Sequence, residues 1–357
     1  MANSEESMQP ADYASISLAQ NYGEHVPWEL PVQYCAADCI KSGDTVLDIG
    51  GNIGGVAIAL SRMTGVNGRV YTFEPNIEMW PHLLENLAIN HAENVSHIPL
   101  ACFSESGKLM KFYSDPSFYK TGSGLMHEIA GAKTFDVVTI SVDDFCFSNS
   151  LHPSFMKIDV EGAEIHVLRS AEKLLETLHL PVIIEYQVNT HPDGNDSLLY
   201  LEKKGYLFFD VNTYERVSTT IYASKVTNFS LVNVLCIHHG TTLAEKYLHL
   251  KKELFYKKQV NEKEVLQICD INLLPGRYIV EIDFDCPDSV VGGLAIKNHS
   301  GYIAYYEADT KHLKQHTCST CVININEDQA IGVEFIKKGT YSAGLNKIII
   351  SKIVFDI

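Results

Sequence analysis

Positive charge and long apolar runs are both scarce in this sequence of 357 residues. Lys and Arg number 28 against 44 Asp and Glu, so the formal net charge is −16. Such a surplus of negative charge disfavours nucleic acids and other partners held mainly through phosphates. No apolar run approaches the ~18 residues that a membrane-spanning helix needs, and the polar, acidic N-terminal stretch does not resemble a signal peptide. We therefore expect a cytoplasmic protein with no membrane span and no nucleic-acid partner.

Regularly spaced cysteines are also missing. The nine cysteines are odd in number and scattered along the chain, which is typical of reduced thiols in a cytosolic protein. Cys318 and Cys321 form a CxxC pair, but no second pair stands at the spacing of a zinc site. We expect these cysteines to be small buried residues rather than a zinc or redox centre.

The length of the chain favours two domains, because single cores usually stop growing at about 250–300 residues. An apolar content of 46% can fill two cores. We expect an α/β domain over residues 1–240, a charged, helix-prone connector over 241–264 and a second domain over 265–357.

The most informative stretch lies between Thr45 and Pro75. Val46 to Ile49 is a short apolar run that ends in glycines, as in a buried parallel strand. Apolar residues then recur at helical spacing from Val56 to Met63, and Val70 to Phe73 reads as a second buried strand. Strand, glycine turn, helix and strand make up one half of a nucleotide-binding α/β fold.

Two ligands compete for this unit. A dinucleotide site requires G-x-G-x-x-G, so that pyrophosphate can lie at the helix N-terminus. Here Asn52 takes the place of the second glycine, and Asp48 precedes the first, where it would repel a pyrophosphate. S-adenosylmethionine is a cation without phosphate, and it suits Asp48 together with the close backbone approach that Gly50 and Gly54 permit. Glu74, at the end of the second strand, can accept hydrogen bonds from both ribose hydroxyls.

The next segments place candidates for the other end of the cofactor and for the acceptor. Val95 to Phe103 reads as a third strand, and Cys102 would lie near the adenine if the strand order is the usual one. The turn-rich stretch from Ser114 to Lys133 is long for a loop inside a compact domain, so it is our candidate acceptor lid.

A second acidic strand end follows at Asp159. Phe155 to Ile158 is an apolar strand, and a neighbouring strand in such a sheet would bring Asp159 beside the reactive end of the cofactor. Glu161 and Glu164 have a simpler explanation, since acids in the first turn of a helix stabilise its dipole. The strand that begins near Pro181 also ends in an acid, Glu185, which is the expected partner of Asp159 if the reaction uses a Mg²⁺ ion.

These motifs, in this order, resemble the FkbM-type methyltransferases. The resemblance rests on residues 46–54, 73–75, 141–145, 156–164 and 183–185, and it extends from about Pro27 to His238. It implies a class I, Rossmann-like methyltransferase fold, S-adenosylmethionine as donor, and O-methylation of a sugar or polyketide-type hydroxyl. By this resemblance Asp48, Gly50, Asn52 and Gly54 line the methionine end, Glu74 holds the ribose and Asp159 faces the acceptor. One departure is Gln187, where members often carry a histidine.

The hydrophobic pattern of the sequence changes after the connector. Short alternating runs recur from 277 to 355, separated by turn residues, and this pattern predicts an antiparallel β-sandwich that folds independently. Tyr302, Tyr305 and Tyr306 offer aromatic faces that suit sugars, although tyrosines also pack strands together.

Two functions follow from these observations. The first is an S-adenosylmethionine-dependent O-methyltransferase that acts on a sugar, a glycan or a glycosylated metabolite, with Asp159 and Glu185 as catalytic residues. The second is a catalytically silent cofactor-binding scaffold whose sandwich binds carbohydrate or mediates assembly, as in a homo-oligomer joined through the C-terminal domain. Retention of the acids at 48, 74 and 159 favours the enzyme.

Overall fold

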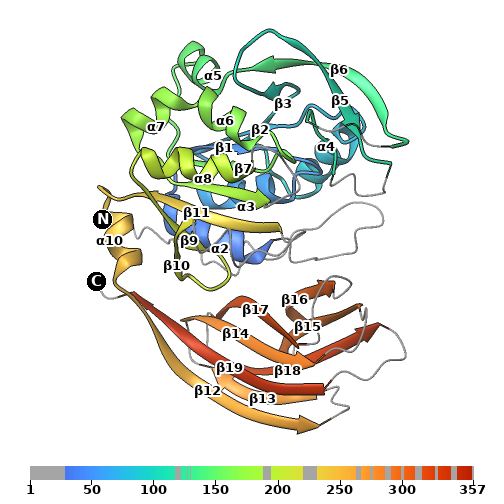
Figure 1. Cartoon of the computed structure of the whole chain (residues 1–357), viewed down its shortest axis with the longest axis vertical. Coiled ribbons are helices and arrows are strands. Elements are labelled where there is room, and N and C mark those ends of the chain that lie inside the picture. Colours follow the sequence, from blue (N-terminus) through green and yellow to red (C-terminus); the bar gives the residue numbers. More distant parts are fainter. Residues whose placement is uncertain are drawn as a thin grey trace.

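The computed structural model describes residues 29–116, 122–126, 128, 130–187, 194–219, 231–262, 267–273, 276–285, 291–298, 301–309, 316–325, 329–338 and 344–355. Its N-terminal part is an eight-stranded sheet flanked by helices, and the C-terminal strands lie together at the other end of the molecule (Figure 1). The described helices include none that is long and apolar enough to span a bilayer.

The central sheet has the strand order β10-β9-β11-β8-β7-β1-β2-β3. Its strands are β1 (Thr45–Ile49), β2 (Arg69–Phe73), β3 (Val95–Ile98), β7 (Phe155–Ile158), β8 (Val182–Gln187), β9 (Tyr206–Asp210), β10 (Arg216–Val217) and β11 (Leu231–His238). Pairing is parallel from β8 to β3 and antiparallel from β8 to β10. The chain builds outward from β1 through β2 and β3, then returns to the other side of β1 as β7. This reversal at β1 creates the crevice in which α/β sheets bind ligands.

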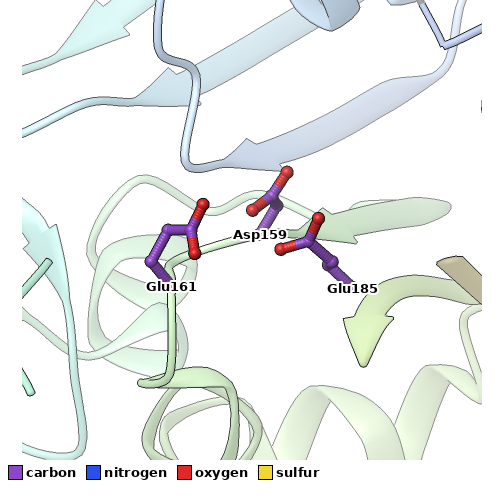
Figure 2. A group of neighbouring side chains, drawn as sticks. All are labelled: Asp159, Glu161 and Glu185. Atoms are coloured by element: carbon purple, nitrogen blue, oxygen red, sulfur yellow. The ribbon is translucent and has the colours of Figure 1, made fainter. Parts of the chain in front are cut away.

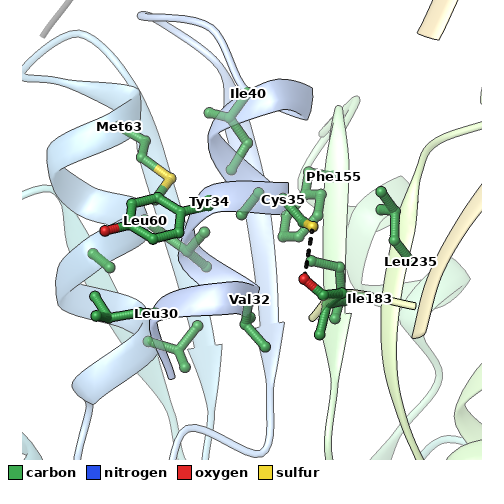
Figure 3. Packing of buried hydrophobic residues seen from close by; sticks show 14 of the residues in the cluster. Leu30, Val32, Tyr34, Cys35, Ile40, Leu60, Met63, Phe155, Ile183 and Leu235 are labelled. Atoms are coloured by element: carbon green, nitrogen blue, oxygen red, sulfur yellow. Dashed lines mark hydrogen bonds between the residues drawn. The ribbon is translucent and has the colours of Figure 1, made fainter. Parts of the chain in front are cut away.

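Helices cover both faces of this sheet. They are α2 (Leu30–Cys39), α3 (Gly55–Thr64), α4 (Trp80–Ile89), α5 (Val142–Ser148), α6 (Glu164–Ser170), α7 (Glu172–Leu178), α8 (Gly194–Lys203) and α10 (Thr242–Leu248). Side chains alternate across a strand, so Val46 packs in one core with α2 and α3, whereas Leu47 and Ile49 pack in another with α5 to α8. Helix α2 packs in the first core through Leu30, Val32 and Tyr34 (Figure 3).

The third predicted strand is wrong in its extent. Only Val95–Ile98 joins the central sheet as β3, and Pro99 follows it. Proline cannot donate to a ladder, and beyond it β4 (Ala101–Cys102) pairs with β6 (Lys133–Ile140), which in turn pairs with β5 (Leu109–Ser114). Cys102 therefore belongs to this small sheet, which lies against the edge of the main one.

The helix-prone connector predicted over 241–264 is also wrong in part. Helix α10 ends at Leu248, and the following residues form strand β12 (Leu250–Glu262), which pairs along its length with β19 (Gly344–Phe355). Alternating lysines and apolar residues suit the edge strand of a sheet as well as they suit a helix, and long-range pairing decides between the two.

The C-terminal strands form two antiparallel four-stranded sheets with the orders β12-β19-β14-β17 and β13-β18-β15-β16. The remaining bounds are β13 (Gln267–Leu273), β14 (Gly276–Asp285), β15 (Val291–Asn298), β16 (Gly301–Asp309), β17 (His316–Ile325) and β18 (Gln329–Lys338). The side chains of the three tyrosines on β16 lie outside the described residues, as does that of Gln187.

The first C-terminal sheet shares a core with the α/β domain. Tyr278 and Ile350, from β14 and β19, are fully buried in the same cluster as α2 and β9. Arg277 donates to Asp38 on α2 at 2.6 Å and to the Tyr214 hydroxyl at 2.9 Å. The C-terminal strands are thus fixed to the helix that precedes β1.

Candidate functional site

The strand register brings the predicted acids to one edge of the sheet. Ile49 pairs with Phe73 and with Ile158, and Ile158 pairs with Ile184. The next residue of each strand therefore lies in one row at the carboxyl ends, and this row consists of Gly50, Glu74, Asp159 and Glu185.

Gly50 permits the closest approach between two of these strand ends. It has φ +94°, and a Cβ at this position would lie 1.6 Å from the Asp159 carbonyl oxygen. No other residue fits there without moving the backbone that carries Asp159. Gly54 has φ +87° and precedes α3, where its neighbours are Leu83 and Leu87. Gly54 therefore shapes the turn before α3 and does not line the cavity described below.

Asp48 is fully buried beneath the row. Its Oδ2 accepts a hydrogen bond from the Thr72 hydroxyl at 2.8 Å, and its Oδ1 is buried with no hydrogen-bond partner. Burial raises the pKa of Asp48, and the positive charge of Lys157 partly opposes this shift. Asp48 acts on the site through its charge, because it does not line the cavity described below.

Glu74 binds the glycine turn as well as facing the cavity. Its Oε2 accepts from the Asn52 backbone N–H and its Oε1 from that of Asn76, both at 2.7 Å. Burial raises the pKa of Glu74 to about 7, although these two bonds oppose the shift. Each carboxylate oxygen can accept a second hydrogen bond, so two acceptor positions remain for a ligand.

A cavity of about 320 Å³ opens above the row of strand ends. It is lined by Glu29, Ile49, Gly50, Gly51, Asn52, Ile53, Gly55, Val56, Phe73, Glu74, Pro75, Asn76, Met79, Leu100, Ala101, Cys102, Phe112, Ser123, Leu125, Lys157, Asp159, Val160, Glu161, Ala163 and Glu185. Of the predicted site residues, the cavity brings together Gly50, Asn52, Glu74, Cys102, Asp159 and Glu185, and it leaves out Asp48 and Gly54. Ser123 and Leu125 come from the predicted lid, part of which lies outside the described residues.

Three carboxylates converge at one end of this cavity. The side chains of Asp159, Glu161 and Glu185 point toward one another (Figure 2), and one oxygen of each lies within 4.8 Å of the others. Glu185 Oε2 is buried with no hydrogen-bond partner. Burial raises the pKa of Glu185, and the charges of Asp159 and Glu161 raise it further. Three carboxylate oxygens are a donor set that fits Mg²⁺, and they also suit an organic cation.

Lys157 is the one cation among the described residues that line the cavity. Its side chain is 2% exposed, and its Nζ lies 2.6 Å from Asp159 Oδ2. Burial acts to lower the pKa of Lys157, but the carboxylates of Asp159, Glu29 and Asp48 together raise it above its ordinary value. Lys157 therefore stays charged and holds Asp159 in place.

Sequence reasoning missed Lys157 and Glu29 and assigned Glu161 to a helix dipole. Glu161 instead precedes α6, in the left-handed region at φ +53°, and it faces the other two acids. A lysine inside an apolar strand was a usable signal, because buried lysines need a nearby anion. Glu29 carried no such signal, since only the packing of α2 brings it to the cavity.

The comparisons with known proteins agree with this geometry. Residues 48–208 match the family described as the methyltransferase FkbM domain. The hexuronic acid methyltransferase AglP of Haloferax volcanii is 28% identical over 160 residues, which cover 44% of this chain and 62% of AglP. The chain thus spans less than two thirds of the length of this relative.

Solved structures overlap only in part. Methyltransferase FkbM from Methylobacillus flagellatus KT has a TM-score of 0.36 at 16% identity, covering 55% of this chain and 43% of its own. Aeropyrum pernix fibrillarin, in complex with S-adenosyl-L-methionine, has a TM-score of 0.33 at 13% identity, covering 56% and 68%. Residues 48–208 of this chain thus match the FkbM methyltransferase domain, and the strand-end motifs lie within this segment.

Proposed function

We propose that the chain is an S-adenosylmethionine-dependent O-methyltransferase that acts on a hydroxyl of a sugar, glycan or glycosylated metabolite. The observation that carries the proposal is the charge of the cavity. Among the described residues that line it are five carboxylates, those of Glu29, Glu74, Asp159, Glu161 and Glu185, against one cation, that of Lys157. Such a cavity attracts a positively charged ligand and repels the phosphates of a nucleotide cofactor.

Different residues serve the donor end and the acceptor end of this cavity. S-adenosylmethionine, when bound, supplies a methyl group on an electrophilic sulfonium. Glu74 and the turn around Asn52 hold the ribose, and Cys102 lies on the adenine side. Asp159 would accept a hydrogen bond from the acceptor hydroxyl and take its proton, while the bound donor would supply the methyl group and leave as S-adenosylhomocysteine once its carbon–sulfur bond is broken.

The acidic cluster also bears on the acceptor. AglP is a hexuronic acid methyltransferase by name, but three converging carboxylates would repel an acidic sugar. A hydroxyl of an uncharged sugar is therefore the better acceptor for this chain. Mg²⁺ between Asp159, Glu161 and Glu185 would lower the pKa of such a hydroxyl, and a chelator separates this version from direct base catalysis.

The C-terminal strands suit an accessory domain. The two antiparallel sheets form a β-sandwich in this proposal, which begins near Leu250 because β12 pairs with β19. This domain binds the carbohydrate or joins two copies of the chain. Sedimentation of the full chain with and without a glycan ligand distinguishes these two roles.

The test of the proposal is transfer of labelled methyl from S-adenosylmethionine to a panel of neutral and acidic glycans. Calorimetry first establishes whether the donor binds and NAD does not. Transfer to neutral hydroxyls is the expected result. Donor binding without transfer to any glycan would favour the silent scaffold, and failure to bind the donor would overturn both.

A further inference from the structure

Glu29 lies outside the matched family segment, yet it lines the cavity. It immediately precedes α2 and is in the left-handed region at φ +44°. Its backbone carbonyl accepts from the Gln33 N–H at 3.1 Å, while its side chain makes no capping hydrogen bond. The helix therefore uses the backbone of Glu29 and leaves the carboxylate for another partner.

The position of this carboxylate is fixed by packing. Pro31 sits in the first turn of α2 and restricts its backbone there. Leu30 and Tyr34 bury the helix in the same core as Phe155 of β7 (Figure 3). Lys157 follows Phe155 on the same face of β7, because side chains alternate along a strand. The start of α2 is thereby held beside Lys157.

The carboxylate of Glu29 is incompletely satisfied. Its Oε2 is buried and accepts no hydrogen bond, and Lys157 Nζ, at 4.0 Å, is too distant to donate one. Lys157 is already committed to Asp159 at 2.6 Å. Burial raises the pKa of Glu29, and Asp159 and Asp48 raise it further, against the opposing charge of Lys157. An added cation with N–H donors would donate a hydrogen bond to Oε2 of Glu29 and favour the ionised form of this carboxylate.

We infer that Glu29 binds the α-ammonium group of the methionine moiety of the donor. This inference rests on the proposed function, and it assigns a residue that the family motifs do not include. Glu74 serves the ribose and the cluster of Asp159, Glu161 and Glu185 serves the acceptor, so the ammonium is the part of the donor that still requires an anion. Lys157 is a positioning residue, because its Nζ lies 2.6 Å from Asp159 and its charge attracts Glu29 at 4.0 Å.

The experiment measures the affinity of the full chain for S-adenosylhomocysteine and for the same molecule without its α-amino group. The wild type should prefer the first by at least about tenfold, since a hydrogen bond between charged groups contributes on this scale. Glu29→Gln should reduce this preference to less than about threefold, with little change in affinity for the deaminated molecule. Glu85→Gln removes an exposed glutamate of α4 and should keep the wild-type preference. Glu29→Asp keeps the charge one methylene further back and should give an intermediate preference.

The outcomes test the proposed function and the role of Glu29 separately. If the wild type binds neither molecule, the proposed function fails. If the wild type binds both equally, or if Glu29→Gln keeps the full preference, the donor site stands and the role of Glu29 is wrong. Should Glu29→Gln fail to fold, Glu29→Asp with the wild-type preference intact would equally overturn the assignment.

Discussion

Asp159 is the residue on which the proposed chemistry depends. It stands at the end of β7, faces Glu161 and Glu185, and is held by Lys157 at 2.6 Å. A sugar hydroxyl is a weak nucleophile at neutral pH, so an acceptor for its proton is needed in the transition state. The contact with Lys157 keeps this acceptor in one orientation.

We predict that Asp159→Asn lowers turnover by about 10²–10⁴-fold, the usual contribution of a general base. Asparagine keeps the shape of the side chain and removes its charge, so affinity for S-adenosylhomocysteine should change much less. Labelled methyl transfer and calorimetry measure the two effects. Turnover within threefold of the wild type would show that Asp159 is structural. Wild-type activity that is lost with chelator and restored by Mg²⁺ would place a metal in the acidic cluster.

Glu164 gives a prediction for pH. It is 6% exposed, and its Oε1 accepts from the backbone N–H groups of Val160 and Gly162. Burial raises its pKa from 4.5 to about 7. Because the folded state favours the protonated form, this group contributes stability below pH 4.5 that is lost as the pH rises through about 7.

Glutamine can accept the same two hydrogen bonds without a charge. Glu164→Gln should therefore match the wild type near pH 5 and exceed it at pH 8 by on the order of 3 kcal/mol, since one pKa unit corresponds to about 1.4 kcal/mol. Chemical denaturation at both pH values measures the difference. Glu85→Gln controls for the loss of one negative charge. A variant that is equally stable at both pH values, relative to the wild type, would contradict the raised pKa.

At the scale of elements, strand β7 joins the core to the site. Phe155 and Lys157 face the core of α2, whereas Met156 and Ile158 enter the core of α5 to α8. A lysine in the middle of a buried strand is costly unless anions surround it. Asp159, Glu29 and Asp48 supply those anions, so the strand is stable only with the site acids in place.

We predict that Lys157→Met lowers the free energy of unfolding by about 3–5 kcal/mol at pH 8, because removing one partner of a buried pair leaves the other charge uncompensated. The loss should be smaller at pH 5, where the orphaned carboxylates can take up protons. Lys133→Met is the matched control: Lys133 is 77% exposed in its pair with Glu78, and its removal should cost less than about 1 kcal/mol. Equal effects of the two variants would argue against a buried charge cluster.

At the scale of the whole molecule, the two halves of the chain are joined through α2. Asp38 accepts from Arg277 at 2.6 Å, from the Tyr247 hydroxyl at 2.8 Å and from Lys246 at 3.1 Å. The same helix starts beside the cavity with Glu29. The C-terminal sheet thus shares a core with the element that carries a cavity residue, and the independent folding that the sequence suggests stays a prediction that truncation tests.

We predict that a chain ending at His249 unfolds at a lower temperature than the full chain and binds a dye that reports exposed apolar surface. Truncation removes Tyr278, Ile279 and Ile350 from the core and leaves Asp38 without Arg277. Affinity for S-adenosylhomocysteine should fall, because α2 loses its support. A truncated chain that unfolds cooperatively near the wild-type temperature, with full affinity, would show that the C-terminal sheets are dispensable to the site.

The α/β order of elements and the strand ends that carry the candidate site residues follow from the sequence pattern. Apolar runs that end in glycine or an acid identify parallel strands and the residues at their carboxyl ends, because a parallel sheet aligns those ends at one edge. For this reason Gly50, Glu74, Asp159 and Glu185 lie in one row at that edge, and their roles toward a ligand stay predictions. Gly54 and Asp48 were assigned to the ligand by the same motif, but the motif does not distinguish residues that face a cavity from residues that support it.

Which further charges share the cavity depends on packing between elements far apart in the chain. Glu29 reaches it through the packing of α2, and Glu161 through a left-handed residue before α6. Neither position follows from local periodicity. Strand β12 is a further case, since its lysine-rich sequence suits a helix or an edge strand and its pairing with β19 selects the strand. Contacts between residues far apart in the chain settle such choices, because their energy depends on neighbours that a local pattern does not contain.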